Sequence, residues 1–234
     1  MDNGPLRTRQ ALDDELRQLE QHLLQFGAYV EGMLERATRA LVQQDLNLAR
    51  QVVAEDDRAD EMDLAIEQTC MRLLALQQPM ARDLRFIGTA MKIIVDLERI
   101  GDYSVDIAKT AIGLADAPTF RPLGDIPKMS ELVRGQVRCA LQALVQHSLD
   151  TARHCAVTDA DVDTMWKALR QELQGIIQEQ PELTVPAVAL ILVARYLERI
   201  ADHAVNIAER VTYIETGQLE TLVRRHSADP TQSA

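Results

Sequence analysis

Acidic residues recur at helical spacing in both halves of the sequence. Glu98, Asp102 and Asp106 stand four residues apart, so in a helix they form one row. Glu198 and Asp202 repeat the first two of these acids one hundred positions later. Like charges at this spacing cost an isolated helix about 0.3 kcal/mol per pair, and more where they lose contact with water. Each row therefore predicts a positive charge close by.

A pair of aspartates in the preceding segment matches the first row. In an antiparallel helical hairpin, residues that lie level with each other have numbers with a constant sum. Asp60 paired with Glu98 centres the hairpin on Pro79, and Asp56 paired with Asp102 gives the same centre. Proline ends helices, so this turn falls where the sequence independently requires one.

The second half repeats the arrangement. Asp163 paired with Glu198, and Asp159 paired with Asp202, centre a hairpin between residues 180 and 181, at a Gln-Pro step. We therefore expect each half to bring two aspartates of one helix level with a glutamate and an aspartate of the next.

Four facing carboxylates cannot all stay ionised alone, so they keep protons, pair with arginines or bind cations. Carboxylate oxygens suit Mg, Mn, Ca and iron, and zinc also binds carboxylates. We interpret each half as a metal site, and the alternative is a solvated acidic face neutralised by Arg99, Arg195 and Arg199. The predicted ligands are Asp56, Asp60, Glu98, Asp102, Asp106, Asp159, Asp163, Glu198 and Asp202.

Enzymatic chemistry has little support in the sequence. No glutamate lies three residues before a histidine, as the Glu-x-x-His motif of di-iron oxidases requires, and no nucleotide-binding or nucleophile-elbow motif occurs. His203, beside Asp202, is either an additional ligand or a surface residue. We expect a protein that is not an enzyme. The alternatives are a metal-dependent phosphohydrolase or oxidase, and a purely structural helical protein with exposed acids.

The segments around these acids have the periodicity of amphipathic helices. Apolar residues recur at threes and fours, and aromatic residues make up 3% of the chain. Proline and glycine gather between residues 113 and 127, which predicts a linker. The predicted helices run from about residue 9 to 41, 49 to 77, 81 to 114, 129 to 148, 152 to 178 and 185 to 215.

One stretch occurs twice, at Asp96–Ala108 and at Tyr196–Ala208, which is typical of a duplicated unit. The chain therefore predicts an all-α fold of two tandem, pseudo-symmetric three-helix bundles. We expect these bundles at residues 9–115 and 125–216, with flexible tails at 1–8 and 217–234. A single six-helix bundle is the alternative.

Charge and cysteine content narrow the class of protein. The net charge of −11 argues against nucleic-acid binding, because phosphate backbones require a basic surface. The three cysteines, Cys70, Cys139 and Cys155, are odd in number and lack a CxxC motif, so we expect reduced core residues in a cytoplasmic protein. No signal peptide is evident, and the longest uncharged run, 183–194, is too short to cross a bilayer.

The chain resembles the PhoU family over roughly residues 10–216. The resemblance rests on the duplicated Leu-Glu-Arg-Ile-(Gly/Ala)-Asp motif, the turn Gln78-Pro79-x-Ala81-x-Asp83-Leu84-Arg85 and the paired aspartates. It implies two three-helix bundles related by pseudo-twofold symmetry, multinuclear clusters of iron or other metals at the E/D-x-x-x-D motifs, and a homodimer.

The resemblance also implies a function. Members of this family restrain phosphate uptake and the phosphate-starvation two-component response without catalysing a reaction. The implied partners are the ATPase subunit of the phosphate-specific ABC transporter and the phosphate-sensing histidine kinase, and they are the protein's only link to the membrane. The second half departs from the family pattern, because Asn206 replaces Asp106 and the turn near Pro181 lacks Ala-x-Asp-Leu-Arg. We therefore expect the halves to differ in function.

Overall fold

The described part of the chain is helical throughout, and the predicted all-α class is confirmed. The computed structural model describes residues 4–115, 123 and 125–222. No helix in these ranges combines the length and apolar composition needed to cross a bilayer. The elements are α1 (Gly4–Gln43), α2 (Leu46–Ala54), α3 (Asp56–Leu76), α4 (Arg82–Gly113), α5 (Ile126–Gln146), α6 (Leu149–Val157), α7 (Asp159–Glu179), the short 3₁₀ helix η1 (Pro181–Leu183) and α8 (Thr184–Thr216).

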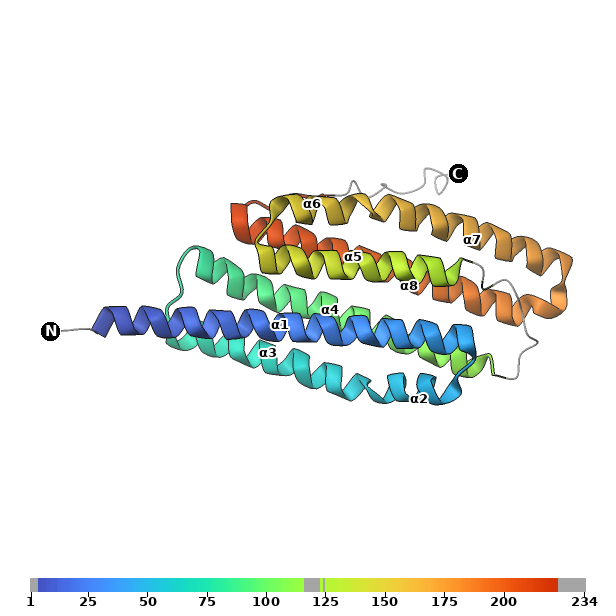
Figure 1. Ribbon diagram of the computed structural model, residues 1–234, viewed down its shortest axis with the longest axis horizontal. Helices are drawn as coiled ribbons and strands as arrows, with labels where there is room; N and C mark the ends of the chain where they lie inside the picture. The colour runs from blue at the N-terminus through green and yellow to red at the C-terminus, as the bar shows by residue number, and fades with distance from the viewer. Residues whose placement is uncertain (1–3, 116–122, 124, 223–234) are drawn as a thin grey trace, which may run out of the picture.

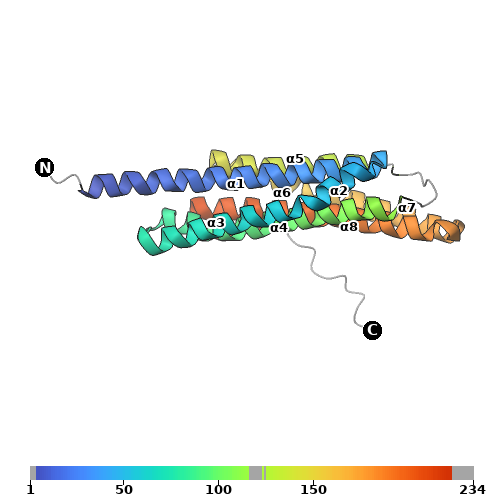
Figure 2. The same cartoon turned by 90° about the horizontal axis from the view of Figure 1, so that it is seen from below.

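The helices form two three-rod bundles that lie side by side. In the first bundle the rods are α1, α2 with α3, and α4, and in the second they are α5, α6 with α7, and α8 (Figure 1). The hairpin turns after α3 and after α7 lie at opposite ends of the molecule. Across the two bundles α1 packs on α5 and α4 packs on α8, and Figure 2 shows α1 and α5 together in one layer. The predicted architecture of two tandem bundles is therefore confirmed.

Two predicted helices are each divided in two. The predicted helix 49–77 is α2 and α3 with a break at Glu55, and the predicted helix 152–178 is α6 and α7 with a break at Thr158. Both break residues keep right-handed helical dihedral angles, so hydrophobic periodicity continues through the break and conceals it.

The helices α1, α2, α5 and α6 start earlier than periodicity indicates. Asp45 accepts hydrogen bonds from the backbone of Asn47 and Leu48, and Ser148 accepts one from Thr151, so each caps the helix that follows it. Helix α1 begins at Gly4 instead of near residue 9, within the predicted tail. The boundaries of the predicted bundles stay predictions, because residues 116–122 and 124 of the linker lie outside the described residues.

The apolar stripes fill a core that both bundles share. Leu19, Leu23 and Phe26 of α1 are fully buried, and each buried side chain of this size stabilises the fold by about 2 kcal/mol. Gly27 lets α1 approach α5 closely, since a Cβ there would lie 2.4 Å from Cδ2 of Leu141. The bundles are therefore packed against each other through side chains at close range.

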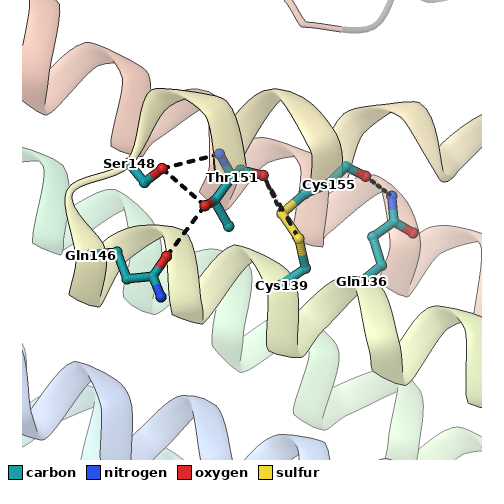
Figure 3. Close-up of a disulfide and its surroundings, with 6 residues drawn as sticks. All are labelled: Gln136, Cys139, Gln146, Ser148, Thr151 and Cys155. Carbon is teal, nitrogen blue, oxygen red and sulfur yellow. Dashed lines mark hydrogen bonds between the residues drawn. A yellow bond between two sulfur atoms is a disulfide. The ribbon is translucent and has the colours of Figure 1, made fainter.

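The prediction that the cysteines are reduced is wrong. Cys139 of α5 and Cys155 of α6 form a disulfide, with their Cα atoms 5.7 Å apart (Figure 3). Among the described cysteines only Cys70 is outside a disulfide, and it is buried as expected. The helical hairpin between α5 and α6 turns at His147, which has the left-handed φ of 49°. The two cysteines are equidistant from this turn. Like the paired acids, they therefore lie level with each other on two antiparallel helices.

Candidate metal centres

The first acidic site contains Asp56 and Asp60 of α3 and Glu98 and Asp102 of α4. Burial raises the pKa of Asp56, and the charges of Asp60 and Asp102 raise it further. Burial also raises the pKa of Glu98, as do the charges of Asp102 and Asp60, against a lowering by Arg99. Both predicted level pairs are therefore electrostatic neighbours.

The second acidic site contains Asp159 and Asp163 of α7 and Glu198 and Asp202 of α8. Burial raises the pKa of Asp159, and the charges of Asp202 and Asp163 add to it. Burial, followed by the charge of Asp202, raises the pKa of Glu198 to about 7, although two neighbouring arginines lower it. The second hairpin thus reproduces the pairing of the first.

A cleft of about 470 Å³ opens over the second acidic site. Glu198 lies in its wall with 9% of its surface exposed. Oε1 of Glu198 accepts a hydrogen bond of 2.5 Å from Nη1 of Arg195. Oε2 is buried and has no hydrogen-bond partner among the described residues. A buried carboxylate oxygen without a hydrogen-bond donor suits a bound cation, so Glu198 fits the role of one metal ligand at this position.

Arginines occupy part of each site. Nη1 of Arg99 lies 2.7 Å from Oδ2 of Asp102, and Nη1 of Arg199 lies 3.1 Å from Oδ2 of Asp202. Within the described ranges, no three His, Cys, Asp or Glu side chains converge on a point where they could hold one ion. The exposed pairs Arg99–Asp102 and Arg199–Asp202 each stabilise the fold by at most about 1 kcal/mol, so a divalent cation would displace the arginines at little cost.

Asp106 occupies a different position from the other predicted ligands. Burial raises its pKa, Lys109 lowers it, and Asp102, one turn away, raises it. Its charge also raises the pKa of Tyr196, on α8 of the other bundle. Asp106 therefore lies at the edge of the first acidic site, beside the boundary between the bundles.

Asp63, one helical turn beyond Asp60, also belongs to the first acidic site and is not among the predicted ligands. Burial is the largest effect that raises the pKa of Asp63, and the charges of Glu67 and Asp60 raise it further. The charge of Asp63 in turn raises the pKa of Glu98. The spacing of Asp60, Asp63 and Glu67 at i, i+3 and i+7 is the signal that places all three on one face of α3.

A polar cluster that sequence patterns do not indicate joins α4 to α8. Oδ1 of Asp96, which is buried, lies 2.9 Å from Nδ1 of His203 and accepts a hydrogen bond of 3.0 Å from Asn206. Close by, the rings of Tyr103 and Tyr196 stack with their centroids 5.7 Å apart. His203 is therefore a half-buried contact between the bundles and not a surface residue, and its role as an additional ligand stays a prediction.

The family comparison matches each bundle separately. A model of the PhoU domain matches residues 23–111 and again residues 126–211. The chain belongs to the PhoU family. The two matches also support the internal duplication inferred from the repeated motif.

Relatives match nearly the whole chain. A PhoU homolog of the phosphate-specific transport system from Clostridium acetobutylicum is 36% identical over 212 residues, covering 90% of this chain and 97% of the relative. The homolog from Pseudomonas aeruginosa is 37% identical over 209 residues, covering 89% of this chain and 86% of the relative.

Two crystal structures have the same fold. PhoU from Pseudomonas aeruginosa matches with a TM-score of 0.85 and 37% identity, covering 88% of this chain and 99% of that one. The phosphate transport system regulatory protein PhoU from Streptococcus pneumoniae matches with a TM-score of 0.84 and 33% identity, covering 89% of this chain and 99% of that one.

Proposed function

We propose that this protein is a non-enzymatic negative regulator of phosphate uptake and of the phosphate-starvation two-component response. The observation that carries the proposal is the match of both bundles, at more than 30% identity, to accessory and regulatory proteins of phosphate transport. This chain in turn covers 97% of the Clostridium acetobutylicum relative and 99% of the Pseudomonas aeruginosa crystal structure, so no extra domain of theirs has to supply the function.

The protein acts as a cytoplasmic adaptor between two partners. One is the ATPase subunit of the phosphate-specific ABC transporter and the other is the phosphate-sensing histidine kinase, and the protein reaches the membrane only through them. The adaptor is a homodimer and does not bind nucleic acid. Its net charge of −11 is compatible with this role, because it opposes non-specific binding to anionic lipid and nucleic acid.

Both acidic sites hold metal ions, iron or zinc first, with Mg, Mn and Ca as alternatives. The paired carboxylates of α3 and α4, and of α7 and α8, are the ligands, with Asp106 at the edge of the first site. A bound cation supplies positive charge that neutralises the facing acids and can bridge to a carboxylate on a partner. The raised pKa of Glu198 and its buried Oε2 without a donor support this part of the proposal.

A binding experiment with purified components tests the adaptor role. The full-length protein is immobilised, loaded with iron or zinc, and exposed to the transporter ATPase or to the cytoplasmic part of the kinase. We expect both partners to be retained, and retention to fall in the Glu98→Gln/Asp102→Asn variant. Glu61→Gln is the control, because Glu61 is an exposed acid on α3 that pairs with Arg58.

A genetic readout completes the test. Deletion of the gene should raise phosphate uptake and derepress the starvation response under phosphate-replete growth, and the metal-loaded protein should not hydrolyse generic phosphoesters. Unchanged uptake together with failure to retain either partner would refute the regulatory proposal. Metal-dependent phosphoester turnover would favour the enzymatic alternative.

A further inference from the structure

The disulfide lies at the junction that positions the second acidic site. Cys155 is in the last turn of α6, and Asp159 begins α7 four residues later, across the break at Thr158. The bond ties the end of α6 to Cys139 in the middle of α5 (Figure 3). The position of Asp159 therefore depends on a junction that one covalent bond fixes.

Gln136 makes a second connection at the same place. Its Nε2 donates a hydrogen bond of 3.2 Å to the backbone carbonyl of Cys155 (Figure 3). Its side chain also lies close enough to Asp159 to lower the pKa of that carboxyl, against the larger effect of burial. Gln136 lies three residues before Cys139 on α5, so the disulfide and this amide hold one junction together from neighbouring turns.

The first bundle fixes the equivalent junction without a covalent bond. The end of α5 is displaced from the end of α1 by 103 positions, and α6 and α7 are displaced from α2 and α3 by the same number. Cys139 therefore corresponds to Arg36, and Thr158 to Glu55. Nη2 of Arg36 lies 2.5 Å from Oε2 of Glu55. The hydroxyl of Tyr29 donates a hydrogen bond of 3.2 Å to the carbonyl of Glu55. A reductant can therefore release the junction of the second bundle but not that of the first.

We propose that Cys139–Cys155 is a reversible redox-modification site that sets the cation affinity of the second acidic site. The proposal rests on the proposed metal-binding function of that site. Cys139 is partly exposed and Cys155 is fully buried, so Cys139 is the sulfur that an incoming thiol reaches. Helix α6 is nine residues long and therefore depends on its packing against α5 and α8, so cutting the bond that fixes it to α5 loosens it.

The co-reactant is a protein dithiol of the thioredoxin class. Its thiolate attacks the sulfur of Cys139, the bond between the two cysteines breaks, and Cys155 leaves as a thiolate that takes up a proton. The second thiol of the reductant then attacks the mixed disulfide and releases Cys139 as a thiol. Two electrons and two protons pass to this protein, and the reductant becomes a disulfide. Oxidation by a protein disulfide of higher potential is the reverse reaction.

The test uses the full-length protein with its first acidic site silenced by Asp60→Asn/Asp102→Asn, so that Mn²⁺ titration reports on the second site alone. We expect the oxidised protein to bind Mn²⁺ at least tenfold more tightly than the same protein after treatment with thioredoxin. Adding Cys139→Ser/Cys155→Ser should give the weak affinity and remove the response to reductant. Cys70→Ser is the matched control and should keep the response.

Hydrogen exchange supplies a readout that does not depend on metal. Reduction should speed amide exchange in residues 149–163 several-fold and leave residues 46–60 unchanged, with and without Mn²⁺. Equal Mn²⁺ affinity in both redox states, or a disulfide that resists thioredoxin in the folded protein, would overturn the proposal. If Mn²⁺ binds neither form although exchange responds to reduction, the proposed metal function of the site is wrong, and the link to cation affinity is wrong with it.

Discussion

The two acidic sites have the same level pairs of carboxylates but different surroundings. Where the first site has Asp63, the second has Trp166 at the corresponding position of α7. Where the first has the exposed Val95, the second has Arg195, which binds Glu198. Duplication has thus conserved the pairing set by the hairpin, while the neighbouring residues have made the first site more acidic and the second more balanced in charge.

The second acidic site has fewer uncompensated acids than the first, but its glutamate is more deeply buried. The side chain of Glu98 is 29% exposed, whereas that of Glu198 is 11% exposed. The pKa of Glu198 rises to about 7 even though Arg195 and Arg199 lower it, because loss of water outweighs the two positive charges. The comparison teaches that depth, more than the number of neighbouring acids, decides how strongly a carboxylate in this fold needs a partner.

The largest expected effect is loss of metal from one site at a time. Glu98→Gln/Asp102→Asn should lower Mn²⁺ affinity at the first site by more than about 100-fold, since even residues that only support metal ligands contribute 10- to 100-fold. Glu198→Gln/Asp202→Asn should do the same at the second. Calorimetric titration with elemental analysis measures both, and Glu61→Gln is the control for loss of an exposed acid. If each double variant removes all binding, the sites form one unit and the comparison fails.

The next effect concerns the shared core. Leu97 and Leu197 occupy corresponding positions in the repeated stretch and are both fully buried. Leu97→Ala and Leu197→Ala should each lower the free energy of unfolding by about 3 kcal/mol. Denaturant unfolding followed by circular dichroism measures the loss. A large difference between the variants, or separate transitions, would mean that the bundles unfold as independent units despite their packing.

A smaller effect tests the buried charge of Glu198. Its pKa is about 7 in the folded protein, against an ordinary value of 4.5. The folded state therefore holds this proton more tightly than the unfolded chain, and stability is lost as the pH rises from about 4.5 through 7. At pH 8, in chelator, Glu198→Gln should stabilise the protein by on the order of 2 kcal/mol, and near pH 4 the difference should disappear.

The matched variant for that experiment is Glu98→Gln at the more exposed site. Burial raises the pKa of Glu98 as well, so the substitution should act in the same direction but more weakly. Thermal unfolding of each variant across the pH range measures the difference. A larger gain for Glu98→Gln than for Glu198→Gln would show that charge, and not depth, governs the two sites.

The smallest effect comes from exchanging the neighbours. Arg195→Val removes a positive charge beside Glu198 and should tighten Mn²⁺ binding at the second site about threefold to fivefold. Val95→Arg should weaken the first site by a similar factor, because exposed charge pairs contribute up to about 1 kcal/mol. Titration of each variant with Mn²⁺ measures the change in affinity. Affinities that do not move would mean that Arg195 has no part in the asymmetry between the sites.

Much of the fold could be predicted because its information is local. Apolar periodicity identified the helices, and the repeated stretch identified the duplication. The paired acids and Pro79 set the register of the first hairpin, since residues equidistant from a turn must lie level in antiparallel helices. The breaks at Glu55 and Thr158 were missed because they keep helical dihedral angles and leave the periodicity intact.

The sequence by itself determined the helices, the two bundles and the level pairing of their acids, all of which follow from spacing along one or two helices. The tertiary structure alone decided how deeply Glu198 is buried, that Asp96 of one bundle meets His203 of the other, and that Cys139 and Cys155 are bonded. These features depend on how far each helix is rotated about its axis and on which neighbour lies against it. Packing between helices sets both, and the apolar periodicity of a single helix does not encode which neighbour it meets.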